Sequence, residues 1–460
     1  MQISIPRIEN MPEYEAVKIQ QLIDTFNYHE NKNKAKQKYY EGAVTLSDVN
    51  LGIALPQAMR NLTVGCEWGA KAVDVLASRS MFDGFVNQNG TDNEDLTKII
   101  DKNNFISQYM KACKDQLKFG CTFATLSADP DAGCKIRFHS PQTASALWDG
   151  EKGRIECGMA IIDTVPDEKE AQTWHPSHIN FYTDTDIWEL RCVNGFWNAT
   201  RHPHIMGMPL MVAMIWNGTS AKPFGRSRIK YPVRALIDGY IRTIANATIA
   251  LEFDTTPQKY ILGVTDEQYD AIVSDKFKQY VGSIIAATQN PETGQNPVFG
   301  QLAQGSLAPH VEMIRILATQ FSAATGLTVT DTGVVNDANP TSSDAILAQS
   351  QTLVCLAEQL NAGNGDALKL IALMALAIAK NVKMGDLTDA ESGVVAHFKN
   401  PAMPSVSVTA DAAIKIASAR PEFASTDTFL EMIGFDQADI RRIKAQELRV
   451  RGQQVLSEIE

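Results

Sequence analysis

Residues 226–254 read RSRIKYPVRALIDGYIRTIANATIALEFD. Pro232 lies in what would be the first turn of a helix, where proline is tolerated, and Pro257 follows the stretch. We therefore expect one helix over residues 228–254, about 38 Å long at 1.5 Å per residue, which is long for a globular protein. The apolar side chains recur every three or four residues, the spacing of one helix face: Ile229, Val233, Leu236, Ile237, Tyr240, Ile241, Ile244, Thr248 and Leu251.

A second long helix is expected at residues 309–326, where Pro309 begins it and Gly326 ends it. Its apolar residues share one face: Val311, Ile314, Leu317, Phe321 and Ala324. Two long helices therefore flank a small module at residues 257–308. The module is expected to contain a strand at 260–264, a short helix at 267–280, a strand at 283–287, a turn at 290–296 and a strand at 298–302.

The chain before the first long helix predicts helices followed by a β meander. Helical patterns cover residues 11–41, 67–77 and 105–118. Between residues 121 and 216 the period changes towards two, as in antiparallel strands. Asn194-Gly195 is the best hairpin signal and favours a type I′ turn. Residues 210–216 are continuously apolar, which predicts a strand buried on both faces.

A long loop is expected after the second long helix, at residues 327–339. It carries two acidic residues and no basic one, and unstructured loops of this length are often functional. Thr341-Ser342-Ser343-Asp344 contains a capping-box pattern that begins a helix running to about residue 359. Asn361-Ala362-Gly363-Asn364-Gly365 predicts a break before the helix resumes over 366–382. Pro401 and Pro404 mark a linker before a helical segment at 410–460.

Length and composition limit the class of protein. At roughly 150 residues per domain, the 460 residues suggest about three structural units. A net charge of −11 disfavours a protein that grips nucleic acid through a general basic surface. The seven cysteines include no Cys-x-x-Cys pair, which argues against a disulfide framework and a zinc ribbon. The longest apolar run, residues 370–379, is far shorter than the roughly 20 residues of a membrane span, and no targeting segment is visible.

The common catalytic and nucleotide-binding signatures do not occur in the sequence. We find no Gly-x-x-x-x-Gly-Lys-Ser/Thr, Gly-x-Gly-x-x-Gly, Gly-x-Ser-x-Gly or His-Glu-x-x-His. We therefore expect no enzyme, no catalytic residue, no metal and no cofactor. The alternative is a metal-dependent or nucleophilic enzyme site built from two histidine pairs in the meander, His175 with His178 and His202 with His204.

Five short motifs, in this order along the chain, resemble those of the portal proteins of tailed bacteriophages. The first resembles the Tyr-Tyr-x-Gly after the family's first helix, the third its Phe-Gly-x-Ser-x-Ile before the stem helix, and the last two the ends of its tunnel loop. The motifs span nearly the whole chain and are Lys38-Tyr39-Tyr40-Glu41-Gly42, Gly207-Met208-Pro209-Leu210-Met211-Val212, Pro223-Phe224-Gly225-Arg226-Ser227-Arg228-Ile229, Thr325-Gly326-Leu327 and Asn339-Pro340-Thr341-Ser342-Ser343-Asp344-Ala345.

The resemblance implies a mainly helical α+β portal fold. Its parts would be a wing of helices and an antiparallel meander (1–227), a first stem helix (228–256), a small α/β clip (257–308), a second stem helix (309–326), a tunnel loop (327–340), a long wing helix (341–400) and a helical crown (401–460). The protein would be made in the host cytoplasm and would form a ring, usually of twelve copies, at a unique capsid vertex of the virion.

The resemblance also implies what passes through the ring and what binds to it. Double-stranded DNA would pass during packaging and ejection. The terminase large subunit and then a head-completion adaptor would dock to the ring, which would also contact the major capsid and scaffold proteins but no membrane. A monomeric adaptor without a channel is a further possibility, and the paired long helices disfavour it.

Three groups of residues would carry this role. The tunnel loop would line the DNA channel and repel the duplex towards the axis through Thr328, Thr330, Asp331, Thr332, Asn336, Asp337 and Asn339. The first stem helix would face the channel or the next copy with Lys230, Arg234, Asp238, Arg242 and Asn246. The clip would dock partner proteins through Gln289, Asn290, Glu292 and Gln295.

Overall fold

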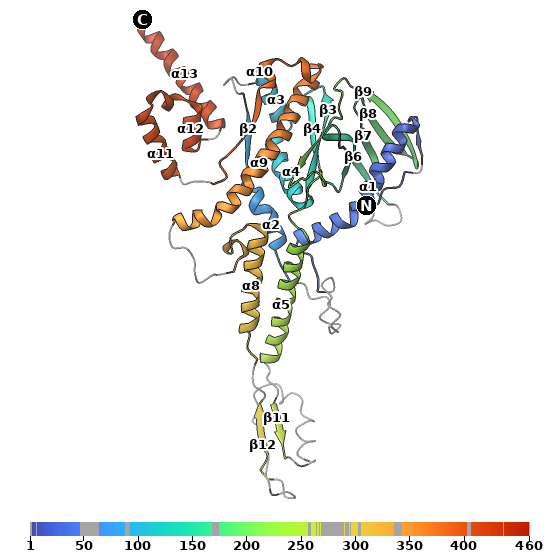
Figure 1. Cartoon of the computed structure of the whole chain (residues 1–460), viewed down its shortest axis with the longest axis vertical. Helices are drawn as coiled ribbons and strands as arrows, with labels where there is room; N and C mark the ends of the chain where they lie inside the picture. The colour runs from blue at the N-terminus through green and yellow to red at the C-terminus, as the bar shows by residue number, and fades with distance from the viewer. Residues whose placement is uncertain are drawn as a thin grey trace. The chain divides into compact units, whose positions relative to one another are not determined.

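The computed structural model of the chain is a mixed α+β structure in which, among the described residues, more lie in helices than in strands, as expected (Figure 1). Contacts within the chain divide it into two compact units. The first contains residues 1–42, 67–234 and 322–460, and the second contains residues 43–66 and 235–321. The structure describes residues 2–5, 7–46, 64–87, 93–167, 174–255, 259–263, 265, 267, 289, 294, 296–301, 305–334, 343–402, 406–435 and 437–459.

The predicted meander is a six-stranded sheet of the first unit. Five strands follow one another as antiparallel neighbours, and β1 joins the edge parallel to β9. At the β8–β9 turn, Asn194 and Gly195 both have positive φ (52° and 83°), as a type I′ turn requires. The strands are β1 (Ile8–Glu9), β5 (Ala144–Asp149), β6 (Arg154–Pro166), β7 (Trp174–Tyr182), β8 (Asp186–Val193) and β9 (Phe196–Pro203).

Helix α1 (Glu13–Tyr40) confirms the prediction for residues 11–41 and packs on this sheet. Its apolar face, which includes Leu22, Ile23 and Phe26, forms one core with inward-facing strand residues such as Phe181 and Leu190. Along β8 the residues alternate between buried and more exposed positions, because successive side chains of a strand point to opposite faces. The period-two pattern therefore reflects a sheet with one buried face.

A second, three-stranded sheet lies in the same unit, with the order β10-β3-β4. The predicted apolar strand is β10 (Met211–Ile215), which pairs with β3 (Cys121–Asp129), and β3 pairs in turn with β4 (Gly133–His139). Helix α4 (Phe105–Phe119) packs on β3 and β4, α3 (Glu94–Lys102) packs on β4, and α2 (Trp68–Ala77) packs on α4. The sequence did not indicate α3. Strands β2 (Phe82–Asn87) and β13 (Val394–Phe398) form a separate antiparallel ladder that was also not expected.

Helix α9 (Ser343–Lys380) is one continuous helix of 38 residues, so the predicted break at residues 361–365 is wrong. Both asparagines of that segment are buried and hydrogen-bonded. Ser80 Oγ donates to Asn361 Oδ1 (2.6 Å), Asn364 Nδ2 donates to Tyr109 Oη (2.9 Å), and Gln116 Nε2 donates to Asn364 Oδ1 (2.7 Å). These bonds and the packing of α9 outweigh the weak helix propensity of asparagine and glycine.

By length and composition, residues 348–380 of α9 would be long and apolar enough to cross a membrane. Half of the most apolar window is buried inside the protein. The helix packs on β3, β4, β10 and β13. This packing is that of a core helix.

The long helices predicted on either side of the small module are α5 (Tyr231–Thr255) and α8 (Ala308–Thr325). Helix α5 begins three residues later than expected, because the residues before it are used in the hydrogen bonds described below. In the small module, β11 (Lys259–Leu262) pairs antiparallel with β12 (Val298–Gln301), as two of the predicted strands. The predicted helix at 267–280 and strand at 283–287 lie outside the described residues, apart from Glu267.

The C-terminal segment is helical, as expected, and is divided into several pieces. Pro421 begins a 3₁₀ turn after the first helix, and Gly434 ends a later one with φ at +107°. The pieces are α11 (Val406–Ala419), the 3₁₀ turn Pro421–Ser425, α12 (Asp427–Ile433) and α13 (Gln437–Ile459), and the short helix α10 (Asp389–Ser392) lies before the linker.

Candidate functional site

The motif at residues 223–229 forms a buried junction between distant parts of the first unit. The Arg228 guanidinium donates from Nη2 to the carbonyl oxygen of Thr325 (2.5 Å) and from Nε to that of Ala72. It also lies 5.9 Å from the centre of the Trp216 ring. Burial lowers the pKa of Arg228 to about 10, so the side chain remains charged at neutral pH. Ser227 Oγ donates to the carbonyl oxygen of Lys118 (2.5 Å).

Two glycines allow the backbones to approach closely at this junction. Gly225 has φ at +72°, and a Cβ there would overlap the carbonyl oxygen of Trp216. Gly120 has φ at +113°, and a Cβ there would lie 3.1 Å from the carbonyl carbon of Arg226. Both positions therefore exclude other residue types for steric and conformational reasons.

The motif at residues 38–42 lies at the end of α1 and contacts α2. Gly69 faces the carbonyl oxygen of Tyr39 so closely that a Cβ would overlap it. Tyr40 Oη donates to Asp74 Oδ1 (3.0 Å), and burial together with this carboxylate raises the pKa of Tyr40. Gly42 follows with φ at +65°. The motif thus sets how the first helix ends against α2.

The predicted stem residues do not form a fully exposed stripe on α5. Lys230 and Asn246 are exposed, whereas Arg234, Asp238 and Arg242 are half-buried. Among the described residues, neither Arg234 Nε nor Arg242 Nε has a hydrogen-bond partner. The most buried face of the helix lies one residue earlier in each turn, at Val233, Ile237, Ile241 and Ala245.

The start of the predicted tunnel loop is ordered, which differs from the expected unstructured loop. Thr330–Thr332 form a 3₁₀ turn. Asp331 Oδ2 accepts hydrogen bonds from the backbone N–H of Thr328 (2.9 Å) and from Thr328 Oγ1 (2.8 Å), while Trp68 Nε1 donates to the carbonyl oxygen of Thr332 (3.1 Å). The remaining predicted residues, Asn336, Asp337 and Asn339, lie outside the described residues.

The predicted docking residues of the clip are only partly described. Gln289 is exposed, and its Nε2 donates to the carbonyl oxygen of Gly294 (2.7 Å). Asn290, Glu292 and Gln295 lie outside the described residues.

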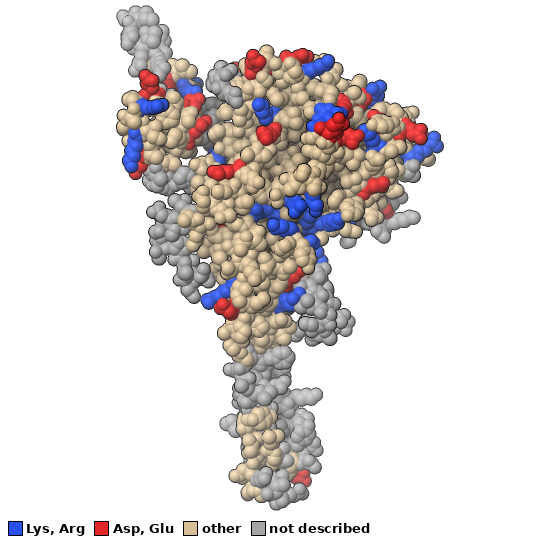
Figure 2. Space-filling view, in the orientation of Figure 1, with Lys and Arg blue, Asp and Glu red and all other residues tan. Residues whose placement is uncertain are grey.

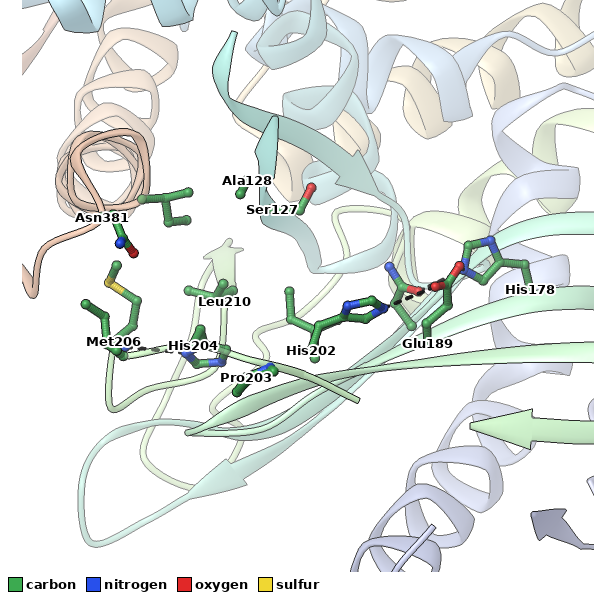
Figure 3. A pocket seen from close by; sticks show the side chains of 14 residues that line it. Ser127, Ala128, His178, Glu189, His202, Pro203, His204, Met206, Leu210 and Asn381 are labelled. Carbon is green, nitrogen blue, oxygen red and sulfur yellow. Dashed lines mark hydrogen bonds and ion pairs between the residues drawn. The ribbon is translucent and has the colours of Figure 1, made fainter. Parts of the chain in front are cut away.

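Three of the four histidines of the alternative enzyme site line one pocket, and His175 is not among the residues that line it. His175 pairs with Asp167 (Nε2 to Oδ2, 2.7 Å). His178, His202 and His204 line a pocket of about 440 Å³ that also includes Glu189, whose carboxylate lies 3.2 Å from His178 Nε2 and 3.3 Å from His202 Nε2 (Figure 3).

The carboxylate of Glu189 in this pocket is paired with Arg191 and contacts two of the histidines. Burial raises the pKa of Glu189, but hydrogen bonds from Arg191 and His202 outweigh it, so this pKa lies below its usual range. Burial, with a contribution from Arg191, lowers the pKa of His178. Within the described ranges, no group of three or more His, Cys, Asp or Glu is arranged to hold a metal ion.

Sequence reasoning missed the buried anchor Arg228 and the polar cluster around Tyr109. It treated the motif at 223–229 only as a family resemblance, although a charged residue directly before a long helix was a visible signal. The paired asparagines in an otherwise apolar stretch indicated the polar cluster, but the pattern was interpreted as a helix break. In both cases the partner groups lie far away in the sequence.

Comparisons with known proteins give one family and several similar structures. Three solved structures are similar at low identity: "Neck of empty GTA particle computed with C6 symmetry" (12% identity, TM-score 0.45, covering 82% of this chain and 90% of that chain), "Neck of native GTA particle computed with C12 symmetry" (12%, 0.44, 81% and 90%) and "Virion of native gene transfer agent (GTA) particle" (11%, 0.44, 80% and 89%). No curated protein matches the sequence. The family model described as "Phage portal protein, SPP1 Gp6-like" matches residues 10–452. Since this match covers nearly the whole chain, the protein belongs to the SPP1 Gp6-like family of phage portal proteins.

Proposed function

We propose that copies of this chain form a ring at one capsid vertex of a virion, through which double-stranded DNA enters and leaves. The observation that carries the ring is the exposed apolar surface of the stem helices. Leu251 on α5 is 45% exposed, and Val311, Met313 and Ile316 on α8 are 50%, 43% and 46% exposed. Exposed apolar side chains that recur on the two stem helices fit a surface that another protein covers.

A ring covers such surfaces without a special partner. Each copy would bury its stem helices against a neighbour through a heterologous contact, and the contacts close when the rotation between copies divides a full turn. We take twelve copies, the usual number in this family, as the expected ring. In this assembly residues 1–227 and 341–400 form the wing, 228–256 and 309–326 the stem, 257–308 the clip and 401–460 the crown.

The conduit would guide DNA without gripping it tightly, because strong phosphate binding would oppose the motor that moves the duplex. Residues 327–340 would form the tunnel loop, with Asp331 and Asp337 as repeated negative charges that keep the duplex near the axis. The fixed turn at Thr330–Thr332 supports this role, because it holds the start of the loop in one conformation.

The clip would dock two partners in succession. The terminase large subunit would bind during packaging, and a head-completion adaptor would bind afterwards. Gln289, Asn290, Glu292 and Gln295 would take part in both contacts, while the wing would contact the major capsid and scaffold proteins. The metal-dependent form of the enzyme alternative would need a ligand cluster, and the described residues contain no group of three or more His, Cys, Asp or Glu arranged to hold a metal ion.

The ring is tested by measuring particle mass and symmetry with light scattering and negative-stain class averages. We expect closed rings with a central hole wider than a duplex. The variant Ile316→Asp should fail to form them, because the transfer of a charge into an apolar contact is costly. Val193→Asp is the matched control, since Val193 is exposed on the β8–β9 hairpin and lies outside the stem. Equal ring formation by both variants would contradict the proposed stem contact.

A further inference from the structure

Basic side chains gather where α1 ends and α5 begins. Figure 2 shows this band of Lys and Arg across the middle of the view. We call the following group the basic collar: Lys32, Lys36, Arg226, Lys230 and Arg234. Two of its members belong to the predicted stem residues, and the other three come from α1 and from the junction motif.

Helix spacing and contacts through Phe119 and Gly120 place the members of the basic collar near one another. Lys32 and Lys36 are one turn apart on α1, and Lys230 and Arg234 are one turn apart at the start of α5. Lys36 Nζ donates to the carbonyl oxygen of Phe119 (3.0 Å), and the next residue, Gly120, lies against the backbone of Arg226. Burial lowers the pKa of Lys36, and the charges of Arg234 and Lys32 lower it further.

Aromatic rings hold two of these cations in place. Lys32 Nζ lies 4.0 Å from the centre of the Tyr28 ring, and the Arg234 guanidinium lies 5.8 Å from the centre of the Tyr39 ring. Cation–π contacts of this kind are attractive. They also reduce the freedom of the two side chains, so less entropy is lost when an anion binds.

The cations of the basic collar have no carboxylate partners in the described part of the chain, where none of the five forms an ion pair. Neighbouring lysines differ, because Lys114 pairs with Asp74 (3.2 Å) and Lys118 pairs with Asp115 (2.9 Å). Like charges that crowd together without compensation destabilise one another. An external anion would relieve this repulsion.

We propose that the basic collar binds phosphates of double-stranded DNA as the duplex passes. The proposal rests on the proposed function, because the ring brings DNA to the collar and repeats the collar around it. The chain has a net charge of −11, so most of its surface repels a polyanion and the collar offers a local exception. The contact would be weak and sensitive to salt, as phosphate contacts are, and would retain DNA without stopping it.

DNA fits the basic collar better than a second copy of this chain does. Many carboxylates of the chain already pair with cations of the same copy, as Glu156 does with Lys18 (2.7 Å) and Asp186 does with Arg201 (2.7 Å). The phosphates of a duplex carry one charge about every 1.7 Å of helix axis, a density that such paired carboxylates cannot supply.

The test compares DNA binding by purified rings of the wild type and of Arg226→Gln/Lys230→Gln, two exposed positions of the collar. A short fluorescent duplex is titrated between roughly 50 and 200 mM salt. We expect the variant to bind about tenfold more weakly at low salt. Its affinity should also depend less on salt, since each phosphate contact adds about 0.9 to the slope of log affinity against log salt concentration. Lys98→Gln/Lys102→Gln on α3 is the matched control and should bind as the wild type does.

The outcomes separate the collar from the ring. Equal DNA affinity of the collar variant and the control overturns the proposal. Loss of rings in the collar variant alone assigns the cations to contacts between copies, which also overturns it. Wild-type rings that do not bind the duplex at low salt refute the collar and leave the ring intact, whereas a wild type that forms no rings refutes the proposed function.

Discussion

Arg228 and Thr325 are joined by a hydrogen bond of 2.5 Å between a guanidinium Nη2 and a carbonyl oxygen. Arg228 stands three residues before α5, and Thr325 is the last residue of α8. The same guanidinium also donates to the carbonyl oxygen of Ala72 in α2, so one buried side chain connects α2, the end of α8 and the segment before α5. Because the site is buried, water cannot replace this side chain as a donor.

Removal of this anchor should destabilise the first unit. Arg228→Met keeps much of the side-chain volume but removes the charged donor of two buried hydrogen bonds, to the carbonyl oxygens of Thr325 and Ala72, which costs about 2–4 kcal/mol in the free energy of unfolding. Calorimetry should show a lower melting temperature. Arg226→Met, at an exposed neighbouring position, should change the stability by less than about 0.5 kcal/mol, and an equal loss in both variants would contradict the anchor.

A methyl group at Gly225 should be poorly tolerated. Gly225→Ala places a Cβ on the carbonyl oxygen of Trp216 and forces alanine into a backbone with positive φ, so soluble expression and melting temperature should both fall. Gly150→Ala provides the comparison, because a Cβ there meets nothing within 4 Å. If both variants were as stable as the wild type, the close approach at the junction would be wrong.

The buried polar cluster on α9 should act as one unit. Tyr109 Oη bonds both Ser80 Oγ (2.8 Å) and Asn364 Nδ2 (2.9 Å). We therefore expect Tyr109→Phe and Asn364→Ala to be non-additive, with a coupling energy of about 1 kcal/mol or more in a double-mutant cycle. Denaturant titrations of the wild type, the two single variants and the double variant measure this coupling energy. If the two effects on the free energy of unfolding simply add, the two side chains do not cooperate.

His139 should make the stability depend on pH. Burial, and then the charge of Arg137, lower the pKa of His139 to about 4, so the folded chain keeps this imidazole neutral while the unfolded chain binds a proton below about pH 6.5. Above pH 6.5 His139 does not reduce the free energy of unfolding, because it is neutral in both states. As pH falls from 6.5 towards 4 only the unfolded chain gains the proton, so the free energy of unfolding falls by up to about 3 kcal/mol. His139→Gln should flatten the curve of unfolding free energy against pH over this range, and a curve parallel to the wild type would refute the assignment.

Charge reversal in the tunnel loop should impair DNA packaging or retention but leave ring assembly intact. The double variant Asp331→Lys/Asp337→Lys replaces the repelling charges with attractive ones. It also removes the acceptor of the Thr328 hydrogen bonds, so Asp331→Asn, which retains an acceptor oxygen, separates turn geometry from charge. The measurement is the DNA content of particles assembled with each variant, and normal content in the double variant would remove the charge argument.

Local sequence patterns predicted those helices and strands whose buried face appears as a regular spacing of apolar residues. The spacing in α5 and the alternation in β8 each report one buried face, so both elements were predicted correctly. The continuity of α9 depends on Ser80, Tyr109 and Gln116, which lie more than 240 residues away along the chain. The β2–β13 ladder also joins distant segments. Periodicity carries no information about such partners.

In the candidate site, too, some features were visible in the sequence and others depended on distant parts of the chain. The motifs around Tyr40 and Gly225 were visible in the sequence because close backbone approaches and turns restrict the residue type locally. The position of Arg228 before a long helix was visible in the sequence, but its partners were not, since its acceptors are carbonyl groups that every residue carries. The half-burial of Arg234, Asp238 and Arg242 also depends on tertiary contacts and not on helix spacing alone.

The hydrogen bond between Arg228 and Thr325 turns residues 229–324 into an exchangeable cassette whose two ends meet at one point. Segments whose ends lie close together can be lengthened, shortened or swapped while the surrounding chain keeps its path. The same property offers a graft site at which a cassette from one family member could be transplanted into another.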